Sequence, residues 1–119
     1  MSKRIYISPS WAFHDDRGDA LNPQLFTLLN RIKETGKLTK AAALANISYR
    51  HGWNLLDQAH QFFGSPVVHL EKGRGATLSP LGEKLLWAEQ RVAARLTPQM
   101  ENLASELNIE IHKEIDELS

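Results

Sequence analysis

Apolar residues in this 119-residue chain recur with different periods in different segments, and each period predicts a different element. Between residues 24 and 35 the spacing is three or four, which predicts an amphipathic helix with one buried face. The apolar positions of that face are Leu25, Leu28, Leu29 and Ile32. Asn22-Pro23 suits the start of this helix and Gly36 its end, because proline is favoured in the first turn and glycine after the last.

Two further helices are predicted after short connections. The first follows Thr39, its predicted N-cap, and is alanine-rich, with Ala41, Ala42, Ala43, Leu44 and Ala45. Its small side chains allow the next helix to approach closely. The second helix follows Ser48, its predicted N-cap, and runs to Phe63. Its predicted core face is Gly52, Leu56, Ala59 and Phe63, and its wet face is Arg50, Asn54, Asp57 and Gln61.

Period-2 patterns predict β-structure at two places. Residues 66–71 and 76–78 form two predicted strands around a tip of sequence Lys72-Gly73-Arg74-Gly75. Residues 4–22 are predicted to form a β-ribbon, since apolar side chains alternate there at Ile5, Ile7, Trp11 and Phe13. Pro9 lacks an N–H group, so this ribbon should be an edge strand or two pieces.

A long helix is predicted from Ser79-Pro80 to the end of the chain, because apolar residues recur every three or four positions. Pro98 lies inside this pattern, which predicts a kink or a break near Leu96–Thr97. These apolar residues form a stripe along one side of the helix. The stripe has no core of its own to join, so it should bind a second copy of the chain. The predicted dimer interface is Leu85, Val92, Leu96, Met100, Leu103, Leu107 and Ile111.

The order helix, turn, helix, β-hairpin defines a winged helix-turn-helix. The predicted fold class is therefore mainly α with a small β component, with an N-terminal β-ribbon and a long C-terminal dimerisation helix. We expect residues 1–80 to form the DNA-binding domain and residues 80–119 to form the linker helix, kinked near Pro98. Within the first domain, the predicted parts are the ribbon 4–22, the helix-turn-helix 38–64 and the wing 66–79.

In such a fold the second helix enters the major groove of DNA and the wing approaches phosphates or a minor groove. Arg50 lies two residues after the Ser48 cap, where an arginine can reach a guanine edge. Tyr49 and Trp53 share a helix face, and Trp53 suits either a DNA contact or packing. The predicted DNA-binding residues are Thr39, Lys40, Ser48, Tyr49, Arg50, His51, Trp53, Asn54, Lys72 and Arg74.

The net charge of zero argues weakly against nucleic-acid binding, but the distribution of charge answers this objection. Residues 31–75 carry seven lysines and arginines against three acids, a balance of +4. Residues 98–119 carry six acids against one lysine, a balance of −5. The negative charge of residues 98–119 thus offsets the positive charge of residues 31–75 in the net charge of the chain.

Composition excludes several other kinds of site. The chain has no cysteine, so thiolate metal sites and disulfides are excluded, and its five histidines form no pair with metal-ligand spacing. No nucleophile–base pair or carboxylate dyad stands out, so we expect no enzymatic activity. The N-terminus lacks the apolar core of a signal peptide and no apolar run is long enough to span a bilayer. We therefore expect a cytoplasmic protein without membrane contact.

Residues 4–95 resemble the N-terminal DNA-binding domain of ModE-type molybdate-responsive regulators and are also similar to the winged helix of LysR-type regulators. Four spaced motifs carry the resemblance in the same order. They are Thr35-Gly36 with Leu38, Ala41 and Ala42; Ile47-Ser48-Tyr49-Arg50 with Trp53; Gly64 with Pro66-Val67-Val68; and Gly73 with Gly75-Ala76, Leu78-Ser79-Pro80, Gly82 and Leu85-Leu86.

The resemblance implies a dimeric bacterial transcriptional regulator that binds double-stranded DNA at an inverted repeat. It also implies molybdate or tungstate as the effector of a separate domain, with no cofactor in this chain. No sequence after residue 95 matches such a domain, so we expect either the DNA-binding piece of a longer regulator or a stand-alone repressor. Two alternatives stay open, a winged-helix protein-interaction module and a regulator that senses an oxyanion directly.

Overall fold

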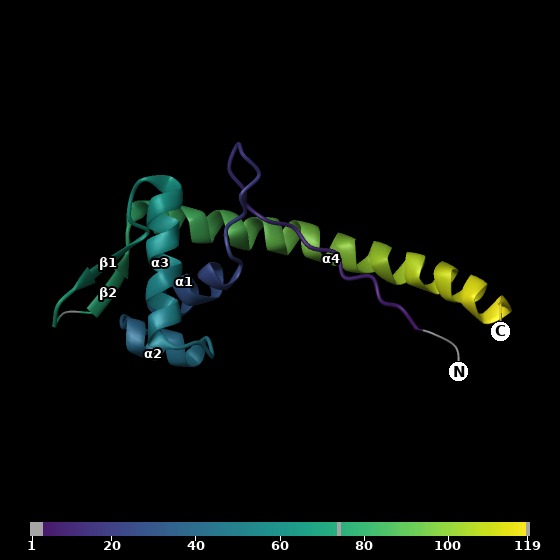
Figure 1. Ribbon diagram of the computed structural model, residues 1–119, viewed down its shortest axis with the longest axis horizontal. Helices are drawn as coiled ribbons and strands as arrows, with labels where there is room; N and C mark the ends of the chain where they lie inside the picture. The colour runs from purple at the N-terminus through teal and green to yellow at the C-terminus, as the bar shows by residue number, and fades with distance from the viewer. Residues whose placement is uncertain (1–3, 74, 119) are drawn as a thin grey trace. The chain divides into compact units, whose positions relative to one another are not determined.

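The computed structural model describes residues 4–73 and 75–118 (Figure 1). Its helices and strands follow the predicted order and confirm a mainly α fold with a small antiparallel sheet. They are α1 Gln24–Thr35, α2 Leu38–Leu44, α3 Tyr49–Phe63, β1 Val68–Glu71, β2 Gly75–Leu78 and α4 Pro80–Glu117. Among the described residues, no helix is long and apolar enough to cross a bilayer.

The chain divides into two compact units. The first, Ala12–Glu89, contains α1, α2, α3, the β-hairpin and the start of α4, whereas the second joins the described part of Met1–Trp11 to Gln90–Ser119. The division between these units falls inside α4, after Glu89. The predicted domain boundary at residue 80 stays a prediction. We describe each unit separately.

The core of the first unit is built on α1. Its four predicted apolar positions are 0–1% exposed, and each buried leucine contributes roughly 1.5–3 kcal/mol. Gly52, Leu56 and Ala59 bury the predicted face of α3, while Phe63 is half-buried. Leu55, which the sequence pattern did not place in the core, is 2% exposed.

Most of the predicted helix ends are confirmed. The Gln24 N–H donates to Asn22 Oδ1 at 2.9 Å, and Gly36 ends α1 with a left-handed φ of 70°. The Ser48 hydroxyl oxygen accepts from the His51 N–H at 3.0 Å and caps α3.

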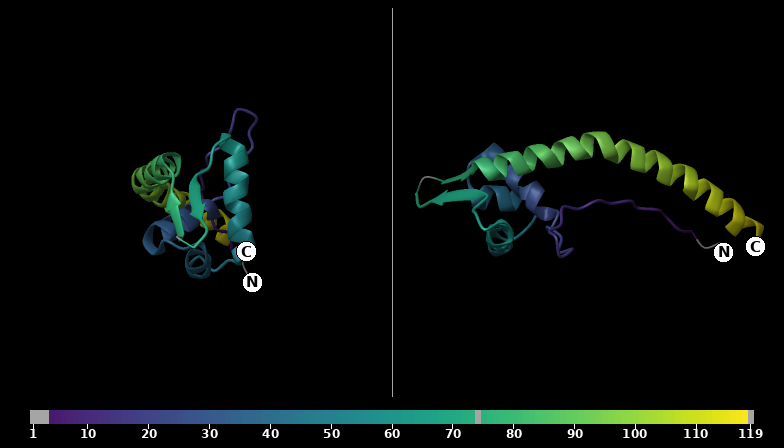
Figure 2. Two further views of the ribbon diagram at one scale, coloured as in Figure 1. Left: turned by 90° about the vertical axis from the view of Figure 1, so that its left-hand side faces the viewer. Right: turned by 90° about the horizontal axis from the view of Figure 1, so that it is seen from above.

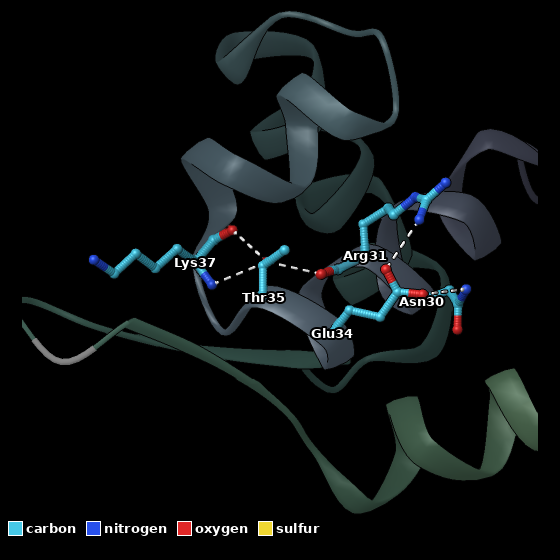
Figure 3. A network of polar contacts seen from close by, with 5 residues as sticks. All are labelled: Asn30, Arg31, Glu34, Thr35 and Lys37. Atoms are coloured by element: carbon cyan, nitrogen blue, oxygen red, sulfur yellow. Dashed lines mark hydrogen bonds and ion pairs between the residues drawn. The ribbon is translucent and has the colours of Figure 1, made fainter.

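The prediction that Thr39 caps α2 is wrong, because α2 begins at Leu38 and Thr39 lies inside its first turn. Lys37 occupies the cap position without a side-chain bond. The Thr35 hydroxyl instead links the end of α1 to the residue before α2. It donates to the Arg31 carbonyl at 2.7 Å and accepts from the Lys37 N–H at 3.4 Å (Figure 3). A contact made from the preceding helix thus replaces the cap.

The β-hairpin projects from the three-helix body (Figure 2), and both core packing and a main-chain bond hold it there. β1 and β2 pair antiparallel, with Val68 opposite Leu78 and Glu71 opposite Gly75. The Ala76 N–H donates to the Gly36 carbonyl at 2.8 Å, which ties β2 to the end of α1. Gly75 has a φ of 99°, and a Cβ there would overlap that same carbonyl oxygen.

The start of α4 is fixed by Ser79, as predicted. Its hydroxyl donates to the Pro66 carbonyl at 2.7 Å and accepts from the Gly82 N–H at 3.0 Å. Gly82 lies so close to Val67 that a Cβ would overlap the Val67 carbonyl oxygen. Leu85 is 8% exposed and packs in the core of its own unit, which leaves little of its side chain for the predicted dimer interface.

The predicted β-ribbon over residues 4–22 is reduced to one antiparallel bridge between His14 and Ala20. In the second unit the N-terminal segment contacts α4 instead of a strand. The Ile5 N–H donates to His112 Nε2 at 3.2 Å, and Arg4 pairs with Asp116 at 3.4 Å. These contacts with α4 are a main-chain hydrogen bond and an ion pair, and Pro9 also prevents a continuous ladder.

Of the two alternatives predicted at Pro98, the break is wrong, since α4 continues through it. A proline removes one hydrogen bond and leaves the carbonyl four residues earlier without its donor. Ala94 and Pro98 are both exposed, so water can satisfy that carbonyl. The kink remains a prediction.

Substitution of the two wing glycines tests whether the close approach of β2 to α1 holds the hairpin in place. Gly73 and Gly75 both have positive φ, but a Cβ at Gly73 would meet no atom within 4 Å. Gly73→Ala should cost roughly 1–2 kcal/mol of unfolding free energy from backbone strain alone. Gly75→Ala should cost about 1–3 kcal/mol more, because it also overpacks the contact with Gly36. Urea denaturation measures both, and equal losses would contradict this description.

Candidate nucleic-acid interface

A groove of about 630 Å³ opens where the wing faces the starts of α2 and α3. It brings together three of the residues predicted to bind DNA, Thr39, Tyr49 and Lys72, which come from three different elements. One local and one long-range contact set these positions: the Ser48 cap begins α3 beside α2, and the Ala76–Gly36 bond holds the wing nearby. A single surface therefore joins residues that are far apart in the chain.

Two cations, Lys37 and Lys72, line this groove together with Glu71. Lys40 and Arg50 directly follow the lining residues Thr39 and Tyr49 in sequence. Lys37, Lys40, Arg50 and Lys72 are all exposed, and among the described residues none of their side chains enters an ion pair. Arg31 and Lys33, by contrast, pair with Glu34 and Glu83 at 2.9 Å. Figure 3 shows the Lys37 side chain extending away from the Arg31–Glu34 network. The predicted basic segment thus retains charge for an external anion on this face.

The first turns of α3 present most of the predicted side chains to solvent. Arg50 and Asn54 are exposed, whereas Ser48 is exposed but already uses its oxygen as the helix cap. His51 is half-buried, and its Nε2 lies 2.7 Å from Gln24 Oε1. Because an amide oxygen only accepts, His51 donates this bond and links α3 to the start of α1. Sequence reasoning placed His51 on the accessible surface and missed this contact.

Large apolar side chains lie in the middle of the same face. Tyr49 is 53% exposed, Trp53 47% and Leu70 46%. Tyr49 and Leu70 line the groove described above, and Trp53 and Leu70 line a second, smaller hollow of about 130 Å³ between α3 and β1. Trp53 is therefore placed at the surface beside the wing, not in the core.

Sequence reasoning missed Lys37, Leu70 and Glu71 as members of this face. Lys37 could have been predicted from the sequence, since it is a cation directly before the first helix of the motif. Leu70 and Glu71 had none, because only the pairing of β1 with β2 shows which strand face meets α3. Arg74, also predicted to bind DNA, lies outside the described residues. Among those that are described, no group of three or more His, Asp or Glu residues could hold a metal ion.

Comparison with curated proteins finds relatives named for molybdenum, although no family model matches the chain. The molybdenum-pterin-binding protein MopB of Rhodobacter capsulatus is 28% identical over 97 residues, which cover 78% of this chain and 36% of that protein. The molybdenum transport protein ModE of Herbaspirillum seropedicae is 32% identical over 75 residues, which cover 58% of this chain and 28% of that protein. The chain thus spans about a third of the length of these relatives.

Comparison with solved structures gives the fold. The DNA-binding domain of CbnR, solved in complex with DNA, matches with a TM-score of 0.61 at 14% identity, covering 71% of this chain and 95% of that one. CbnR is a LysR family transcriptional regulator. In sequence the chain is thus similar to parts of MopB and ModE, and it has the winged helix-turn-helix fold of the CbnR DNA-binding domain.

Proposed function

We propose that this chain is the DNA-binding part of a cytoplasmic, dimeric transcriptional regulator, which reads double-stranded DNA with α3 and holds its backbone with the wing. The observation that carries the proposal is the convergence of Thr39, Tyr49 and Lys72 on one groove, which Lys37 lines as a second cation. Phosphate contacts by such cations supply affinity, and side chains on the first turns of α3 supply sequence preference. The proteins compared above are named for molybdenum-pterin binding, molybdenum transport and transcriptional regulation, which supports a role other than catalysis.

Arg50 is the proposed base-reading residue. It follows the Ser48 cap by two positions, is exposed, and lies on the part of α3 that enters the major groove in this fold. Lys37, Lys40 and Thr39 lie around the start of α2, where a phosphate would meet both charge and hydroxyl donors. On the other side of the groove, Lys72 provides a cation at the wing tip.

We infer that the exposed side of α4 binds a second copy of the chain. Leu96, Leu103 and Leu107 are 37%, 55% and 47% exposed and share one helix face. The N-terminal segment contacts α4 at His112 and Asp116, which lie on a different face from these leucines. A two-fold dimer through the leucine stripe would present two α3 helices to an inverted repeat.

The role of α3 is tested with an operator selected from a random-sequence duplex pool by the wild-type chain. Arg50→Ala should weaken binding to that operator by about 1–3 kcal/mol and relax the preference at one base-pair position in each half-site. The matched control is Gln58→Ala, because Gln58 is exposed and lies farther along α3. This change should leave the operator affinity and the base-pair preference unchanged. Competition mobility-shift assays measure the two quantities, and an Arg50 variant with wild-type affinity and preference would refute the assignment.

The role of the wing is tested by the salt dependence of binding. Lys72→Ala with Arg74→Ala should weaken binding to operator and random duplexes alike, since phosphate contacts carry no sequence information. Loss of two phosphate contacts should reduce the slope of log affinity against log salt by about 1.8. Arg95→Ala, an exposed cation on α4 outside the first unit, serves as the control. An unchanged slope in the double variant would show that the wing does not contact DNA.

The dimer is tested by placing charge on the stripe. Leu103→Glu with Leu107→Glu should produce a monomer at micromolar concentration, because burial of each leucine contributes roughly 1.5–3 kcal/mol and each occurs twice in a symmetric dimer. Affinity for the inverted repeat should then fall far more than affinity for one half-site. Ile109→Glu is the control, since Ile109 is 57% exposed but lies on another face of α4. Sedimentation gives the outcome, and a wild-type chain that remains monomeric at high concentration would overturn the proposal.

A further inference from the structure

An apolar patch occupies the centre of the proposed DNA-binding face, where phosphate binding alone gives no reason for one. We define this patch as Tyr49 and Trp53 of α3 with Leu70 of β1. Each side chain is about half exposed, at 53%, 47% and 46%. The patch is continuous, since Leu70 lines both the groove that contains Tyr49 and the hollow that contains Trp53.

The charged residues around the patch indicate which kind of ligand it binds. Tyr49 and Trp53 are spaced by one helical turn, so they share a face on the half of α3 that carries Arg50. Lys37 and Lys72 line the groove beside Tyr49. Glu71 lines the same groove, and Asp57 lines the hollow with Trp53. A ligand that combines an anionic frame with apolar groups inside it would meet the two lysines and the apolar patch together. In a DNA major groove the C5-methyl of thymine is the apolar group, and it lies between two phosphate backbones.

We propose that the patch reads thymine methyl groups, so that the chain prefers A·T pairs at fixed positions next to the pair read by Arg50. This inference rests on the proposed function and names the feature of the duplex that the site recognises. The wing takes part in base reading through Leu70, in addition to its phosphate contacts through Lys72. Apolar contact discriminates because cytosine and uracil present no methyl group at the same position.

Deoxyuridine scanning tests the proposal directly. Each thymine of the selected operator is replaced in turn by deoxyuridine, which removes one methyl group and keeps every hydrogen-bonding group. Binding is measured by fluorescence anisotropy at one salt concentration. The wild-type chain should bind about fourfold more weakly for each contacted methyl, which corresponds to about 0.8 kcal/mol per buried carbon.

Side-chain variants assign the methyl groups to the patch. Tyr49→Ser, Trp53→Ser and Leu70→Ser should each abolish sensitivity at a different thymine. Leu44→Ser is the matched control, because Leu44 is a 57% exposed leucine that lines neither hollow, and it should keep the full wild-type pattern. Thermal melting confirms that each variant is folded, and a change to Ala replaces any that is not.

The possible results separate this inference from the proposed function. If the wild-type chain binds the uracil and thymine operators equally at every position, the reading of methyl groups is wrong while DNA binding stands. If sensitivity is present but survives in all three patch variants, other side chains read the methyl groups and the proposal is again wrong. If the wild-type chain binds neither duplex, both proposals fail together.

Discussion

The hydrogen bond from the Ala76 N–H to the Gly36 carbonyl is the contact on which the candidate interface depends. It joins the end of α1 to β2, and so it places the wing beside the starts of α2 and α3. Two conditions allow it: Gly36 ends α1 in a left-handed conformation that directs its carbonyl outward, and Gly75 has no Cβ to collide with that carbonyl. The bond acts together with the burial of Val68 and Ala76 in the core, and these contacts hold the wing as one wall of the groove.

Features set by neighbouring residues could be predicted from the sequence. The caps at Ser48 and Ser79 and the left-handed ends at Gly36 and Gly64 depend on side chains within a few residues of each helix end, so local chemistry determines them. The buried face of α1 follows from its spacing alone. The order of these elements then identified the winged helix-turn-helix, and with it most of the surface on which Arg50 and Lys72 lie.

Features set by distant contacts could not be predicted in the same way. Leu85 belongs to the apolar pattern of α4, but the tight approach of Gly82 to Val67 draws this part of the helix into the core. The N-terminal alternation suits a strand as well as a segment that lies against a helix, and only a partner decides between them. Leu70 likewise acquires its place on the candidate interface from strand pairing, which the sequence of β1 alone does not specify.

The central claim is that α3, the start of α2 and the wing form one DNA-binding surface. Backbone amide chemical shifts of the labelled chain, followed during titration with a short random-sequence duplex, test it most directly, because they need no knowledge of the operator. The account predicts shifts concentrated at residues 37–40, 48–54 and 70–75 that weaken as salt is raised. Shifts concentrated on α4 beyond Gln90, or no salt-sensitive shifts at any residue, would contradict it.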